Sequence, residues 1–221
     1  MSTMRKEIEA CLCANLESGL DPFLADNGFM RRKNSLIYSR KLPEVVQRIT
    51  VHVEIHPKDH PNAAAVIYPF LGVSMDTVNA LVKEMTGGDE ALGGAADTTL
   101  QQPIEFTSAK AARARWPFYQ PDSVPGVVDE LKSFLEQYTL PVLDVYSTPA
   151  GICEEYERAH PSGHLRVDDE RVTTSNIHVA AAMVLCGRIA DATGVLERHY
   201  GRRTGTRKRY QRVFDYLAAK E

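Results

Sequence analysis

The sequence predicts an α+β fold in which an antiparallel sheet with helices on one face is followed by a C-terminal helical region. Three observations predict it. The first two dozen residues have helical periodicity, the segment Val45 to His56 alternates between apolar and largely polar side chains, and helical periodicity returns after Ser123. We therefore expect a sheet region at residues 1–120 and a helical region at residues 121–221 packed on it, an arrangement also compatible with one continuous domain.

The N-terminal helix is predicted from a single apolar stripe at helical spacing. Its members are Ile8, Leu12, Leu16, Leu20, Phe23 and Leu24. Gly28 follows where a helix C-cap is expected, because glycine adopts the left-handed conformation that commonly ends a helix. The stripe indicates one helix of about six turns.

Extended segments are expected next, and together they predict a sheet of four or five strands. Residues 29–32 and 36–42 flank a polar turn and form a hairpin. The clearest strand is 45–56, and 63–72 is another in which Pro69 suggests an edge or a bulge. A short helix capped by Ser74 and a strand at 100–106 follow, and an aromatic cluster around Trp116 is expected where the two regions meet.

The C-terminal half is expected to be helical throughout. A helix lined by Val127 to Tyr138 should end at Pro141, and the next should begin at Pro149. Residues 176–186 and 189–200 indicate a helical hairpin that turns near Gly187, and a last helix is expected at about 206–220.

Charge is unevenly distributed along the chain. The net charge is −3, yet the segment from Arg198 to Arg212 has seven basic residues and no acidic ones, so the remainder is acidic. Such asymmetry bears on partners rather than on fold, and an acidic surface is steered onto a basic partner. The start of the chain lacks the apolar run of a signal peptide, and the longest apolar stretch is far shorter than the roughly 20 residues of a membrane span. We therefore expect a cytoplasmic protein with no membrane partner.

Two stretches resemble a family of uncharacterised bacterial proteins that carry a domain of unknown function. The first joins residues 24–29, Leu-Ala-Asp-Asn-Gly-Phe, to Arg31-Arg32-Lys33-Asn34, and the second is 140–149 together with the 182–196 hairpin. The resemblance implies a helix, a Gly-Phe turn, an antiparallel sheet and C-terminal helices. It implies no catalytic residue, and some members of the family are similar to immunity proteins, which neutralise a toxin by binding it.

The most suggestive chemical pattern is His52, Glu54 and His56, with His60 four residues later. Alternate residues of a strand share a face, and imidazole and carboxylate groups are suitable metal ligands. The first and last of the three would nevertheless lie about 13 Å apart on a straight strand, at about 3.3 Å per residue, so one ion reaches both only if the strand bends. The alternative is an ordinary solvated sheet face, and no cofactor is expected.

The basic segment is the second candidate site. Arginine interleaved with Tyr200 and Tyr210 could bind nucleic acid by phosphate contact and stacking. The residues that would do so, or would bind another acidic partner, are Arg202, Arg203, Arg207, Lys208 and Arg209. Two alternatives are a solvated helix end and neutralisation against the acidic remainder of the chain. Because the isoelectric point is about 6.2, nucleic acid is not the expected partner.

Other reactive groups form no recognisable constellation. The acidic run Asp168-Asp169-Glu170 is typical of a solvated loop, and no nucleophile elbow or phosphate-binding glycine loop occurs. The four cysteines are expected to be reduced and mostly buried. The sequence therefore favours a non-enzymatic protein that binds a protein partner, with a metal-dependent enzyme and a nucleic-acid-binding protein as the alternatives.

Overall fold

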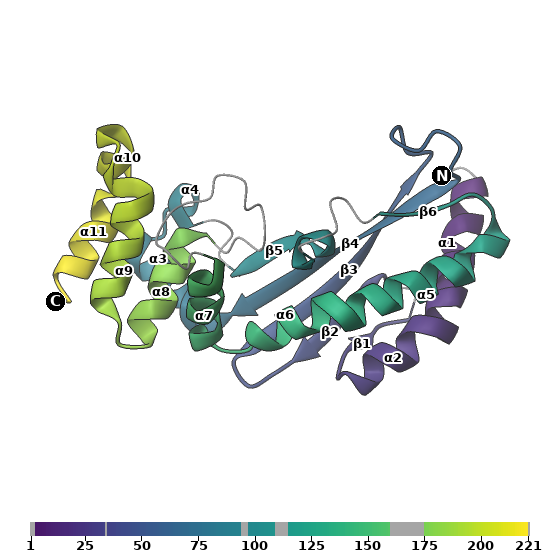
Figure 1. The fold of residues 1–221 in the computed structure, drawn as a ribbon, viewed down its shortest axis with the longest axis horizontal. Helices are drawn as coiled ribbons and strands as arrows, with labels where there is room; N and C mark the ends of the chain where they lie inside the picture. The colour runs from purple at the N-terminus through teal and green to yellow at the C-terminus, as the bar shows by residue number, and fades with distance from the viewer. Residues whose placement is uncertain (1–2, 34, 94–96, 109–114, 160–174, 221) are drawn as a thin grey trace. The chain divides into compact units, whose positions relative to one another are not determined.

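The computed structural model describes residues 3–33, 35–93, 97–108, 115–159 and 175–220, and it has the predicted α+β fold (Figure 1). The chain forms two compact units. Unit 1 comprises residues 1–41, 46–72 and 102–143, and unit 2 comprises residues 42–45, 73–101 and 144–221. Each unit therefore draws residues from both sides of position 120.

The sheet of the described residues has six strands in the order β1-β2-β3-β4-β5, and β6 also pairs with β4. The strands are β1 (Met30–Arg31), β2 (Ile37–Lys41), β3 (Val45–Ile55), β4 (Ala65–Met75), β5 (Leu100–Pro103) and β6 (Trp116–Phe118). The predicted hairpin is confirmed, because β1 and β2 pair in antiparallel register. The sheet exceeds the expected number of strands because the aromatic segment at Trp116 is itself a strand.

The N-terminal apolar stripe forms the helical layer of unit 1. It runs through α1 (Thr3–Asn15), the π-helical turn η1 (Leu16–Leu20) and α2 (Asp21–Asp26). Leu12, Leu16, Leu20 and Leu24 are completely buried, as the spacing predicts. Gly28 then has a φ of 80°, and the backbone N–H of Phe29 donates to the Leu24 carbonyl, which is the expected glycine-terminated helix end.

Strand β3 has one buried and one open side. Its buried side chains, Val45, Gln47, Ile49 and Val51, alternate with more exposed ones. Gln47 identifies what covers the buried side: its Nε2 donates to the carbonyl of Leu143, and its Oε1 accepts from Arg40 Nε at 2.8 Å. Leu143 belongs to a helix that follows the sheet, so helices cover the Gln47 side of β3, and the expectation of helices on one face is confirmed.

The covering helices of unit 1 are nearly continuous. They are α5 (Val124–Phe134), the π-helical turn η4 (Leu135–Thr139) and α6 (Leu140–Val145), preceded by short 3-10 turns at Ile104–Thr107 and Pro121–Ser123. Pro141 does not end the helix as expected: the π-helical turn η4 leads directly into α6, and Pro141 is the second residue of α6. Trp116 packs against Phe134 with ring centroids 5.3 Å apart, so the aromatic cluster lies within unit 1.

Unit 2 is largely helical. Its helices are α3 (Asp76–Thr86), α4 (Glu90–Gly93), α7 (Pro149–Ala159), α8 (Asn176–Leu185), α9 (Ile189–Leu196), the π-helical turn η5 (Glu197–Gly201), α10 (Thr204–Arg209) and α11 (Gln211–Ala218). The predicted hairpin is present as α8 and α9, which pack together and turn at Gly187 with a φ of 75°. Two expectations are corrected: Ser74 lies in β4 and does not cap α3, and the last helix is divided at Tyr210.

Within the ranges described, no helix combines the length and the apolar character needed to cross a membrane.

Candidate functional site

The side of the unit 1 sheet that faces away from the helices is the candidate functional site. We call it the open face and define it by Met30, Ile37, Ser39, Lys41, Arg48, Thr50, His52, Glu54, Tyr68 and Phe70. Two large apolar side chains lie there with substantial exposure, Met30 at 70% and Ile37 at 43%. Arg48, Lys41 and His52 are also exposed. The face therefore combines exposed apolar side chains with exposed basic ones.

Strand register brings these residues into rows. Met30 lies opposite Ser39, and Ser39 lies opposite Arg48, so the first row crosses β1, β2 and β3. Ile37 lies opposite Thr50 in the next row. Side chains directly opposite each other in a sheet share a face and lie about 5 Å apart, so the apolar and basic groups form one continuous surface.

Rings continue this surface across β3 and β4. The His52 ring stacks on Tyr68 with centroids 5.6 Å apart, and it meets Phe70 edge-on at 5.0 Å. The Arg115 guanidinium lies 5.8 Å from the centre of the Tyr68 ring and 3.5 Å from Asp59 Oδ2. These contacts pack the imidazole, the two aromatic rings and the guanidinium against one another, and aromatic side chains are well suited to binding.

The metal pattern predicted for this strand receives no support from the geometry. His52 and Glu54 lie on β3, but β3 ends at Ile55, and His56 follows in the left-handed region with a φ of 53°. His56 therefore does not extend the alternation of the strand. The ring of His52 is engaged by aromatic neighbours, and in the described parts of the chain no group of three or more His, Cys, Asp or Glu side chains could hold a metal ion.

The basic segment is helical, and much of its charge is used inside unit 2. Arg207 Nη1 forms an ion pair with Glu197 Oε1, and its guanidinium lies 4.1 Å from the centre of the Phe214 ring. Arg198 Nη1 donates to the Tyr156 hydroxyl at 2.8 Å, and that hydroxyl is 3.0 Å from His199 Nε2. The rings of Tyr200 and Tyr210 stack on each other at 4.0 Å and leave less of their faces for bases.

Two more cations of this segment lie against the backbone of α4 and the C-cap of α3. Arg209 Nη2 donates to the Ala91 carbonyl in α4 at 3.0 Å. The guanidinium of Arg212 lies over Gly87, the C-cap of α3, so closely that a Cβ added there would be 2.0 Å from Arg212 Cζ. The carboxyl end of α3 carries partial negative charge, which Arg212 neutralises, whereas Arg209 satisfies a backbone carbonyl of α4. Within the described part of the segment, Arg202, Arg203 and Lys208 are exposed cations for which the structure gives no polar partner.

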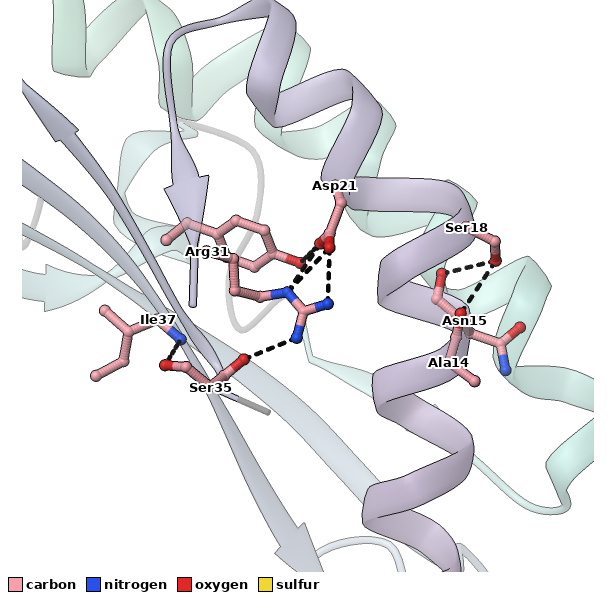
Figure 2. Close-up of polar contacts among 8 residues, drawn as sticks. Ala14, Asn15, Ser18, Asp21, Arg31, Ser35 and Ile37 are labelled. Carbon is pink, nitrogen blue, oxygen red and sulfur yellow. Dashed lines mark hydrogen bonds and ion pairs between the residues drawn. The ribbon is translucent and has the colours of Figure 1, made fainter. Parts of the chain in front are cut away.

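Sequence reasoning missed two satisfied polar clusters. In unit 1, Arg31 donates to both carboxylate oxygens of Asp21, with Nη2 to Oδ2 at 2.7 Å (Figure 2), and the Tyr38 hydroxyl donates to Asp21 Oδ1 at 2.6 Å. Figure 2 also shows Arg31 donating to the Ser35 carbonyl, at 3.0 Å. Burial alone would raise the pKa of Asp21, but the hydrogen bonds from Arg31 and Tyr38 outweigh it and lower that pKa. The cluster ties α2 to β1 and β2 and is structural.

The second cluster, in unit 2, has the composition of a catalytic pair. Ser175 Oγ and His178 Nδ1 are 2.7 Å apart at the start of α8, and His178 also hydrogen-bonds the Thr98 backbone. Burial lowers the pKa of His178 to about 4. The two contacts of the His178 ring tie the start of α8 to the backbone at Thr98. The candidate carboxylates Asp168, Asp169 and Glu170 lie outside the described residues.

Comparison with known proteins gives no relative for this chain: no family model, no curated protein and no solved structure matches it. The resemblance to an uncharacterised bacterial family therefore stays a prediction.

Proposed function

We propose that the protein is a non-enzymatic binding protein that uses the open face of unit 1 to bind a protein partner. One observation carries the proposal. The open face joins exposed apolar side chains, mutually packed rings and cations on a sheet whose other side is packed beneath helices. Binding energy in protein interfaces comes mainly from such apolar and aromatic anchors surrounded by a polar rim.

The charges of the open face indicate what the partner presents. Lys41 and Arg48 are exposed, whereas Glu54 is the only acidic residue of the face and is half-buried. The complementary surface is apolar with an acidic border. This differs from the basic partner that the net charge of −3 suggests, because charges at the contact matter more than the chain total.

An immunity-like role is one form of this proposal, supported only by the sequence resemblance. An immunity protein acts by covering its partner and needs no reactive group. The cytoplasmic location expected from the sequence is part of the same proposal. A metal-dependent reaction on β3 remains an alternative, and elemental analysis of the purified protein tests it directly.

Site-specific photocrosslinking in the producing cells tests the proposal. A photoreactive residue at Ile37 should form an adduct with one protein, and the same residue at Glu130, an exposed position of α5 in unit 1, should not. The adduct should disappear when Phe70→Asp is added, while Glu130→Lys leaves it intact. Equal adducts at positions 37 and 130, or none at position 37, would contradict the proposal. An adduct of position 37 with nucleic acid or with a second copy of this chain would contradict the proposed protein partner.

A further inference from the structure

Two cysteine thiols meet within unit 2. Cys153 lies in α7 and is only 2% exposed, whereas Cys186, the residue that ends α8, is exposed. The two side chains share a hydrogen bond. Cys11 and Cys13 are half-buried, so the expectation that the cysteines are mostly buried is wrong only for Cys186.

An ion pair fixes the same two elements beside the thiols. Glu157 is one helical turn beyond Cys153, so both lie on one face of α7. Arg188 is two residues beyond Cys186, and it donates to Glu157 Oε1 and, at 2.7 Å, to Asp191 Oδ2. Two neighbouring contacts, one between sulfurs and one between charges, thus join a single face of α7 to the turn between α8 and α9.

We propose that Cys153 and Cys186 are a redox modification site, at which a small-molecule disulfide such as oxidised glutathione converts the two thiols into an intramolecular disulfide. Exposed Cys186 is the sulfur that the oxidant reaches, and buried Cys153 is the sulfur that completes the bond. The inference does not depend on the function of the open face, which lies in the other unit.

The reaction proceeds in two exchange steps. The Cys186 thiolate attacks one sulfur of oxidised glutathione, forms a mixed disulfide and releases one glutathione thiolate, which takes up a proton. Cys153 then loses its proton to solvent and attacks the Cys186 sulfur, which forms the protein disulfide and releases the second glutathione. The two cysteines together lose two electrons, and the oxidant gains them. Burial raises the pKa of Cys153 to about 12, so only a small fraction of this thiol is ionised at neutral pH and the second step is the slower one.

Oxidised glutathione added to the full-length, reduced, folded protein tests the proposal. The number of titratable thiols should fall from four to two, the intact mass should fall by two hydrogens with no glutathione retained, and peptide mapping should identify the 153–186 link. Cys153→Ser should stop at the mixed disulfide and retain one glutathione on Cys186. The matched control is Cys11→Ser with Cys13→Ser, which should behave as the wild type, and dithiothreitol should reverse the reaction.

Because Cys153 is buried, its serine variant could fold poorly, so Cys186→Ser serves as the second variant. Cys186 is exposed, so the Cys186→Ser variant should fold normally, and it should form no protein disulfide. The proposal is overturned if the wild type retains glutathione on Cys186 without forming the 153–186 bond, or if Cys186→Ser loses two thiols as the wild type does.

Discussion

The open face of unit 1 and the basic segment of unit 2 both carry many polar groups in the sequence, but they differ in how far those groups are engaged in contacts within their own unit. Four of the seven cations in the basic segment, Arg198, Arg207, Arg209 and Arg212, contact a carboxylate, a hydroxyl, a carbonyl or a helix end within unit 2. On the open face, Met30, Ile37 and Arg48 are exposed at the surface. Most cations of the basic segment are thus engaged in contacts within unit 2, whereas the less charged open face keeps its side chains exposed to solvent.

The difference teaches that the number of charges in a segment does not measure the charge available to a partner. A guanidinium held at a helix carboxyl end already has its counter-charge, and moving it onto a phosphate would forfeit that contact. An exposed apolar side chain beside a fixed ring contributes little to folding where it stands, so burying it against a partner is a net gain. The predictions below test this division between groups that the fold uses and groups that it leaves available.

The two sides of β3 should differ most. Ile49 is completely buried beneath the helices, so Ile49→Ala should lower the free energy of unfolding by about 2–5 kcal/mol through lost burial and a cavity. Its neighbour Arg48 faces outward and is exposed, so Arg48→Ala should change stability by less than about 0.5 kcal/mol. Urea denaturation of both variants measures the contrast. A large loss of unfolding free energy in Arg48→Ala would mean that the open face contributes to the stability of the fold.

His178 should make unit 2 sensitive to acid. Its pKa is lowered from 6.5 to about 4 by burial, so the folded protein favours the neutral ring. The stabilisation is complete above pH 6.5 and declines as the pH falls towards 4, because only the unfolded chain then binds the proton readily. Between pH 7 and pH 5 the wild type should lose about 2 kcal/mol more than His178→Gln. Parallel profiles of unfolding free energy against pH would show that the ring is not held neutral.

Asp21 provides the corresponding test in unit 1. Asp21→Asn removes the charge that Arg31 and the Tyr38 hydroxyl contact, and it should lower the free energy of unfolding by about 1–2 kcal/mol at neutral pH. Because the folded pKa of Asp21 is lowered, its contribution is present above the ordinary value of 3.8 and is lost as the pH falls below it. Thermal denaturation at pH 7 and pH 3 should therefore show a smaller difference between variant and wild type at pH 3. An equal difference at both values would mean that the carboxylate charge contributes nothing.

Periodicity was enough to predict the elements whose stability comes from an apolar stripe. The leucines from Leu12 to Leu24 and the alternation along β3 specify which side is buried, so their helix and strand were predictable. The continuation past Pro141 was not predictable, because a proline within a helical pattern usually ends or kinks the helix, whereas this one follows a π-helical turn and the helix continues. Trp116–Phe118 was missed as a strand because three residues carry no measurable period.

The candidate site was only partly predictable for a different reason. The alternation of β3 indicated a polar face, but Met30, Ile37 and Tyr68 join that face through strand register, which local sequence does not encode. His56 was assigned to the strand because its left-handed backbone, with a φ of 53°, leaves no mark in a run of alternating residues. Likewise, the Arg212 contact with Gly87 joins positions far apart in the sequence.

The contact between Arg212 and Gly87 should have the smallest effect on stability, and the neighbouring Gly88 provides a matched control. Gly87 and Gly88 have φ values of 67° and 81°, so an alanine at either position should cost about 1 kcal/mol of backbone strain. Only at Gly87 would the new Cβ displace the Arg212 guanidinium, since nothing lies within 4 Å of a Cβ at Gly88. Gly87→Ala should therefore cost up to about 1 kcal/mol more than Gly88→Ala, the value of a cation at a helix carboxyl end.

The extra cost of Gly87→Ala over Gly88→Ala should vanish when each alanine is introduced separately into the Arg212→Ala variant, because the guanidinium is then already absent. Urea denaturation of the five variants and the wild type measures it. If the excess persists without Arg212, the contact contributes nothing to α3, and a further cation of the basic segment becomes available to a partner.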